Sequence, residues 1–170
     1  MNEQPTIHDD ENEEGQEEYP SLQLMVFTLG QEEYAVPITQ LKEILRATQV
    51  TPVPLTAAFV KGVANIRGNI IPIIHLAQQF GLKEETTLDK EGFILVVETA
   101  KYQVGFWISN VPNSITITEN LIDKAPNIWQ EEHKEQHFIQ GIVKTQNRMI
   151  ILVDMLRFIE SEIAEKLILQ

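Results

Sequence analysis

Cysteine is absent from the 170-residue sequence. A disulfide scaffold, a zinc–cysteine site and a thiol nucleophile are therefore excluded, and a reducing compartment, the cytoplasm, is the expected location. Long apolar runs are also missing, since none approaches the roughly 18 residues that a membrane-spanning helix requires. The acidic N-terminus lacks the positive start and apolar stretch of a signal peptide, so we expect neither secretion nor membrane insertion.

Positively charged residues are scarce. The chain has 13 Lys and Arg against 25 Asp and Glu, a net charge of −12. Nucleic acid is therefore not expected as a partner, because most of the surface would repel a phosphate backbone. Eight of the acidic residues lie before residue 20, with no Lys or Arg among them. This composition predicts a disordered, solubilising tail over residues 1–20, and an acidic docking tail is the alternative.

Motifs for catalysis are missing as well. The sequence contains no glycine-rich phosphate loop, no nucleophile elbow and no dinucleotide-binding fingerprint. Among the four histidines, only His133 and His137 have a spacing that would place two imidazoles on one helix face, and no third ligand is supplied. A solvated polar face explains them better than a metal site. We therefore expect no enzyme and no cofactor; a polar pocket lined by His75 and several carboxylates would indicate the alternative.

The chain contains an internal duplication. Residues 24–38 align with 94–108 at an offset of 70, and residues 60–76 align without a gap with 139–155 at an offset of 79. The second copy must therefore hold nine more residues between its two blocks, and the polar stretch 120–136 is where we place them. Two copies of one small unit are predicted.

Each aligned block is typical of a β-hairpin, because short runs of Val, Ile, Phe and Tyr flank turn-forming residues. Strands 70–74 and 149–153 are almost continuously apolar, which favours strands covered on both faces. The predicted fold class is therefore mainly β, with two small barrels. We place them in a domain spanning residues 21–160, as intertwined subdomains at roughly 21–90 and 91–155.

A C-terminal α-helix is predicted over residues 155–170. Ile159, Ile163 and Leu167 recur at helical spacing with charged residues between them, and Asp154 is a suitable N-cap. In the first copy, His75 holds the position equivalent to Asp154. It precedes a shorter apolar stretch that ends at a glycine, which predicts a short helix there too.

The duplication separates residues that the fold needs from residues that serve something else. Gly62 recurs as Gly141, which indicates a backbone position where a side chain would not fit. Glu43 and Arg67 instead align with Asn113 and Gln146, so these two charges are candidates for function. The alternative is that they simply form an ion pair tying a helical turn to a hairpin.

Three apolar residues surround Glu43. Leu41, Ile44 and Leu45 have the i, i+3, i+4 spacing of one helix face. Core packing and a partner surface are both open interpretations of this set.

Three segments carry a family resemblance: FTLGQEEYAVPI with QLKEIL, then VPLTAAFVKGVANIRGNIIPIIHLAQQFGL, and later FIQGIVKTQNRMIILVDMLRFI. Together they resemble the CheW-like coupling proteins of bacterial chemotaxis over residues 22–160. The resemblance implies two five-stranded SH3-like barrels. It also implies a cytoplasmic scaffold that is recruited to membrane-associated receptor arrays and bridges chemoreceptor tips to the CheA histidine kinase.

The resemblance also implies roles for single residues. Receptor binding is carried over to Leu41, Gly62 and Arg67. Kinase binding is carried over to Glu43, Ile44 and Ile128. The expected mechanism is protein docking, in which a receptor helix lies between the barrels while the first barrel contacts the kinase. An adaptor of a pilus-motility or other non-flagellar chemosensory kinase is the alternative.

Overall fold

The computed structural model describes residues 18–54, 56–82, 91–124 and 138–164. Most of the predicted tail and insertion lie outside these residues, as do Ile128, His133 and His137. The strands in the described part are β1 (Ser21–Leu29), β2 (Glu32–Pro37), β3 (Glu43–Arg46), β4 (Val60–Ile66), β5 (Asn69–His75), β6 (Phe93–Glu98), β7 (Gln103–Ile108), β8 (Asn113–Thr118), β9 (Ile122–Lys124), β10 (Ile139–Thr145) and β11 (Arg148–Val153). The helical elements are η1 (Ile38–Gln40), α1 (Leu76–Gln79), η2 (Glu119–Leu121), α3 (Met155–Phe158) and η3 (Ile159–Ile163).

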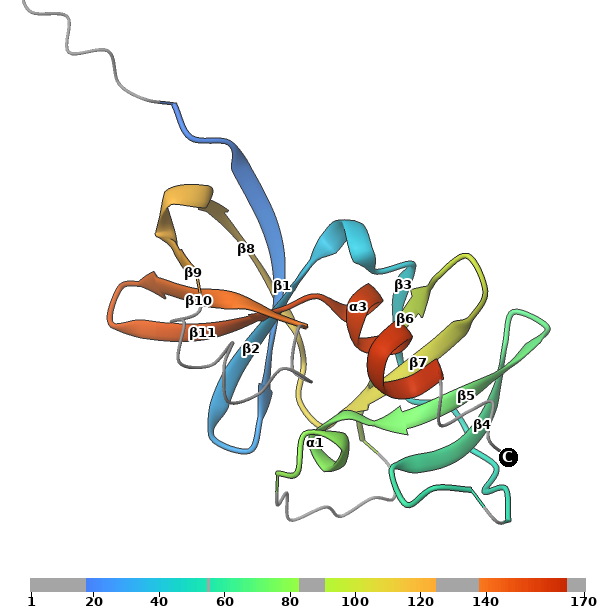
Figure 1. Ribbon diagram of the computed structural model, residues 1–170. Coiled ribbons are helices and arrows are strands. Elements are labelled where there is room, and N and C mark those ends of the chain that lie inside the picture. Colours follow the sequence, from blue (N-terminus) through green and yellow to red (C-terminus); the bar gives the residue numbers. More distant parts are fainter. Residues whose placement is uncertain (1–17, 55, 83–90, 125–137, 165–170) are drawn as a thin grey trace, which may run out of the picture.

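The strands form two sheets, which lie on either side of α3 (Figure 1). Sheet A has the order β8-β1-β2-β11-β10-β9, and sheet B has the order β3-β6-β7-β5-β4. Neighbouring strands are antiparallel except at two places, where β2 pairs with β11 and β5 pairs with β7 in parallel. Each sheet thus consists of two antiparallel halves joined by one parallel contact.

The two sheets are built by exchange between the copies. Hairpin β1–β2 of the first copy pairs with hairpin β10–β11 of the second in sheet A. Hairpin β6–β7 of the second copy pairs with β4–β5 of the first in sheet B. The expected division near residue 90 therefore does not coincide with a boundary between the sheets.

Each sheet curls around its own apolar interior. In sheet A the end strands β8 and β9 are joined directly by η2, which brings the two ends of the sheet together. In sheet B the segment after β3 returns to β4 through the bridge between Thr51 and Val63. This bridge takes the place of β9, so sheet A has six strands and sheet B five. The predicted mainly-β fold with two SH3-like subdomains is confirmed.

Three apolar clusters hold the fold together. One lies inside sheet A and includes Val26 and Leu152, and one lies inside sheet B and includes Ile94 and Trp107. The third and largest contains residues of both sheets, α1, α3 and η3, with Phe158 among its most buried side chains. Alternate residues of one strand serve different clusters, and this two-sided burial explains the almost continuous apolar strands.

The hairpin turns predicted from the repeat are confirmed. Arg67 and Gly68 have φ of +53° and +85°, and Gln146 and Asn147 have +40° and +63°. Two-residue turns with positive φ at both positions match the right-handed twist of the strands they join.

The recurring glycines are required by close backbone approach, as expected. A Cβ atom at Gly62 would overlap the backbone oxygen of Thr51, and one at Gly141 would overlap that of Asp123. Both glycines follow a β-bulge at the start of their strand. In both copies, therefore, a glycine after a β-bulge lets the hairpin lie close to the backbone of the preceding segment.

The structure differs from the sequence in two helical predictions. The helical arrangement of Leu41, Ile44 and Leu45 is wrong, because Glu43–Arg46 forms strand β3 against β6. After Asp154 the chain is helical as predicted, but η3 follows α3 as a π-helical turn. Ile159 and Ile163 are buried there, and the rest of the predicted helix lies beyond the described residues.

Candidate functional site

Glu43 and Arg67 form an ion pair. The Nε of Arg67 donates a hydrogen bond of 2.9 Å to the Oε2 of Glu43. The two side chains differ in exposure, since 78% of Arg67 is accessible against 17% of Glu43. No other hydrogen bond or ion pair of Arg67 involves the described residues, so its Nη groups remain available to a partner.

The elements that carry this pair lie at opposite ends of sheet B. Glu43 begins β3, and Arg67 lies in the turn between β4 and β5. Asn65 shapes that turn by accepting a hydrogen bond of 3.0 Å from the Gly68 backbone N–H. The ion pair therefore connects the end strand of the sheet to the opposite hairpin. The ion pair that the sequence suggested is present, but it joins the hairpin to strand β3 and not to a helical turn.

The other predicted site residues of the first copy lie nearby but are not equally accessible. Leu41 and Ile44 are half-buried and pack against the large cluster between the sheets, whereas Leu45 packs inside sheet B. Strand alternation within β3 explains why Ile44 and Leu45 differ, whereas Leu41 lies before the strand, at the end of η1. Gly62 is buried, so any contribution it makes to binding acts through the backbone shape of β4. Ile128 lies outside the described residues.

Two exposed apolar side chains were not singled out by sequence reasoning. Ile70 and Met149 are 65% and 64% accessible, and they occupy equivalent positions beside the hairpin turns of the two copies. Their alignment in the repeat was visible in the sequence. Their exposure was not, because each stands at the start of an otherwise buried apolar run.

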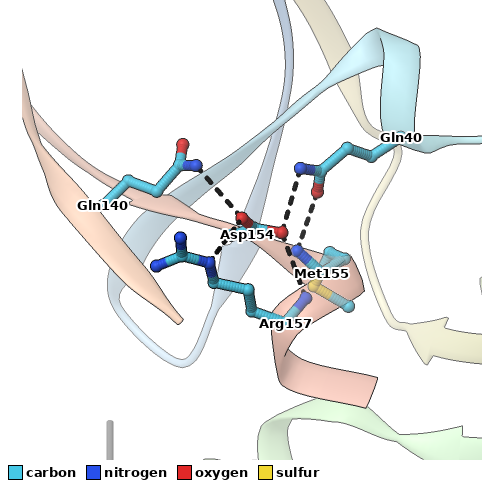
Figure 2. A network of polar contacts seen from close by, with 5 residues as sticks. All are labelled: Gln40, Gln140, Asp154, Met155 and Arg157. Carbon is cyan, nitrogen blue, oxygen red and sulfur yellow. Dashed lines mark hydrogen bonds and ion pairs between the residues drawn. The ribbon is translucent and has the colours of Figure 1, made fainter. Parts of the chain in front are cut away.

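Gln40 was also missed, and it belongs to a polar network between the copies (Figure 2). Its Nε2 donates to the Oδ1 of Asp154 at 3.0 Å, and its Oε1 accepts from the Met155 backbone N–H at 2.8 Å. Asp154 also accepts from the backbone N–H of Arg157 and from Nε2 of Gln140. Asp154 is thus the predicted N-cap of α3, and Gln40 ties that helix to the segment between β2 and β3.

The described part of the chain has no group of three or more His, Asp or Glu side chains arranged to hold a metal ion. Within the same residues, no helix is long and apolar enough to cross a membrane.

Comparisons with known proteins agree on one family. The family profile of the CheW-like domain matches residues 23–162. The chemotaxis protein CheW of Helicobacter pylori is 36% identical over 132 residues, which cover 78% of each chain. The crystal structure of the scaffolding protein TtCheW from Thermoanaerobacter tengcongensis matches with a TM-score of 0.68 and 30% identity, covering 79% of this chain and 90% of that one.

A more limited similarity extends to the protein FrzA of Myxococcus xanthus, at 31% identity over 86 residues, 51% of this chain and 53% of FrzA. The profile match covers most of the chain, and CheW of Helicobacter pylori and TtCheW are matched over 78% and 90% of their own length. The chain therefore belongs to the CheW-like family of non-enzymatic scaffold proteins of bacterial chemotaxis.

Proposed function

We propose that this chain bridges the cytoplasmic tips of chemoreceptors to a CheA-type histidine kinase by protein docking. It performs no chemistry itself and transmits signals through changes in how its partners dock. The family assignment and the accessible guanidinium of Arg67 support this proposal. In this role the protein works in the cytoplasm and is recruited to membrane-associated receptor arrays.

Receptor binding is proposed for Leu41, Gly62 and Arg67. The observation that carries this assignment is the pairing geometry of Arg67, whose Nε contacts Glu43 while the rest of the guanidinium faces outward. A guanidinium held on one edge is pre-oriented, so it loses little side-chain entropy when a carboxylate or carbonyl of a partner binds. The partly exposed edge of Leu41 supplies apolar contact beside it.

Kinase binding is proposed for Glu43, Ile44 and Ile128. Glu43 and Arg67 contact each other, so the two proposed surfaces meet at this ion pair. Binding at one surface can therefore alter the electrostatics of the other. For Ile128 the proposal depends on the family resemblance alone.

Isothermal titration calorimetry of the full chain with a receptor-tip fragment, and separately with the kinase regulatory domain, tests these assignments. Arg67→Glu is expected to weaken receptor binding at least tenfold, because it replaces an attractive contact with a repulsive one. Glu43→Gln is expected to weaken kinase binding.

The matched control is Lys144→Glu, which breaks another exposed ion pair, that with Asp123 at 2.7 Å. Lys144 lies in sheet A, whereas Glu43 and Arg67 belong to sheet B, so both affinities should stay at the wild-type level. Wild-type receptor affinity in Arg67→Glu would refute the site assignment. Failure of the wild-type chain to bind either fragment would refute the function.

The alternative is an adaptor of a pilus-motility or other non-flagellar chemosensory kinase. The partial similarity to FrzA is the observation that favours this alternative. Its discriminating result would be co-purification from the native host with a kinase that does not act on flagellar rotation.

A further inference from the structure

The two copies begin their helices with different capping groups at one equivalent position. His75 is the last residue of β5, Asp154 directly follows β11, and each of them precedes a helix. The Nδ1 of His75 accepts a hydrogen bond of 3.1 Å from the Gln78 backbone N–H. The Oδ1 of Asp154 accepts one of 3.1 Å from the Arg157 backbone N–H.

The proton chemistry of these two caps differs. A carboxylate remains an acceptor down to about pH 4, whereas an imidazole nitrogen accepts only while it carries no proton, and free histidine is protonated below about pH 6.5. A protonated Nδ1 would point a donor at the Gln78 N–H, which is itself a donor. The cap of α1 therefore requires neutral His75 with its proton on Nε2.

The surroundings of His75 add to this requirement. Its side chain is buried, with the residue 6% exposed, and its ring lies 5.0 Å from that of Trp107 in the neighbouring strand β7. On β4, the other neighbour of β5, the Nζ of Lys61 lies 4.3 Å from the centre of the Trp107 ring. Lys61 is the titratable side chain that β4 contributes, and β7, α1 and the rest of β5 contribute none. Protonation would place a charge on this buried ring, which burial disfavours.

The helix that His75 caps packs between the two sheets. Leu76 is fully buried in the cluster between them, and Phe80, which follows α1, is 5.5 Å from Tyr34 of sheet A between ring centres. The same Phe80 ring is 5.2 Å from Phe158 of α3. Loosening of α1 would therefore change packing where the subdomains meet.

We propose that His75 makes the start of α1 a pH-sensitive element, so that a drop below neutrality uncaps this helix while the Asp154-capped helix stays intact. The cap contributes stability at pH values where an uncapped histidine carries no extra proton. This contribution is lost as the pH falls, because the uncapped state binds the additional proton. The proposal does not depend on which partner the chain binds.

NMR of the full-length chain between about pH 7.5 and 5.5, one unit either side of the free histidine value, tests the proposal. At neutral pH, the nitrogen-15 chemical shifts of the imidazole ring should show that the His75 proton is on Nε2. On acidification, the opening constant from hydrogen exchange of the Gln78 amide should rise roughly fivefold, the size expected for loss of one cap, while that of Arg157 should not change.

Two variants separate His75 from other effects. His75→Asp installs the capping residue of the second copy, and it should abolish the pH dependence at Gln78. The triple variant His8→Gln, His133→Gln, His137→Gln leaves His75 as the single histidine and should retain the pH dependence at Gln78. A proton on Nδ1 at neutral pH, or an opening constant of the Gln78 amide that does not change between pH 7.5 and 5.5, would each overturn the proposal. If His75→Asp does not fold, the wild-type and triple-variant titrations decide the question.

Discussion

Arg148 and Glu33 form a two-pronged ion pair across the parallel junction of sheet A. The Nε and Nη2 atoms of Arg148 lie 3.0 and 2.7 Å from the two carboxylate oxygens of Glu33. Glu33 belongs to β2 and Arg148 to β11, so the pair joins the hairpins that the two copies exchange. The equivalent residues of sheet B are Gln103 and Asn69, which carry no charge.

This ion pair should make stability depend on acidity. The hydrogen bond from Arg148 holds the pKa of the Glu33 carboxyl below its ordinary value of 4.5. Because the folded pKa is the lower one, the pair stabilises the fold above about pH 4.5, and this contribution is lost as the pH falls further. Urea unfolding of the wild type should therefore show a larger loss of stability between pH 6 and 3 than that of Glu33→Gln. The difference at pH 6 should be about 0.5–1 kcal/mol, since both side chains are partly exposed; equal pH profiles would contradict it.

The network around Asp154 should be cooperative. Asp154→Ala removes the N-cap of α3 and leaves partly buried donors without an acceptor, so the free energy of unfolding should fall by about 1–3 kcal/mol. Gln40→Ala should cost about 1 kcal/mol, and a double-mutant cycle should show that the two losses are not additive. Gln140→Ala is the control, because its bond to Asp154 is longer, 3.3 Å, and its side chain is exposed. Additive losses would show that Gln40 and Asp154 act independently.

The recurring glycines should not tolerate a methyl group. Gly62→Ala and Gly141→Ala would each drive Cβ into a backbone oxygen, and we expect each to destabilise the chain by about 1–3 kcal/mol in chemical denaturation. Gly62→Ala should be the more severe, because its φ of +147° is also unfavourable for alanine. Gly30→Ala is a control for backbone strain alone, since its φ is positive but its Cβ would meet no atom within 4 Å. A loss as large in Gly30→Ala would assign the effect to strain and not to crowding.

The aromatic cluster between the sheets should dominate stability. Phe158 is 1% exposed, and its ring lies 4.8 Å from that of Phe138 and 5.2 Å from that of Phe80. Phe158→Ala should lower the free energy of unfolding by about 3–5 kcal/mol. Ile70→Ala, at a position that is 65% exposed, should change it by less than about 0.5 kcal/mol. A small loss for Phe158→Ala would mean that the subdomains are stable separately.

Local features were predictable because they depend on neighbouring residues. The hairpin turns, the N-cap at Asp154 and the crowded glycines were all visible in the sequence, since turn geometry, capping and a repeated glycine each leave a short-range pattern. The strand at Glu43–Arg46 was mistaken for a helical face, because three apolar residues at i, i+3 and i+4 fit both a helix and an alternating strand whose two faces are covered.

The duplication, the mainly-β class and the two-subdomain architecture were determined by the sequence itself, because apolar periodicity and repetition are properties of the chain order. Which hairpin pairs with which was decided only in the tertiary structure. Both copies contain nearly the same apolar strands, so pairing within a copy and exchange between copies give the same local pattern. The contacts between Gln40 and Asp154 and between Glu33 and Arg148, each joining residues more than a hundred positions apart, exist because the folded sheets bring the two copies together.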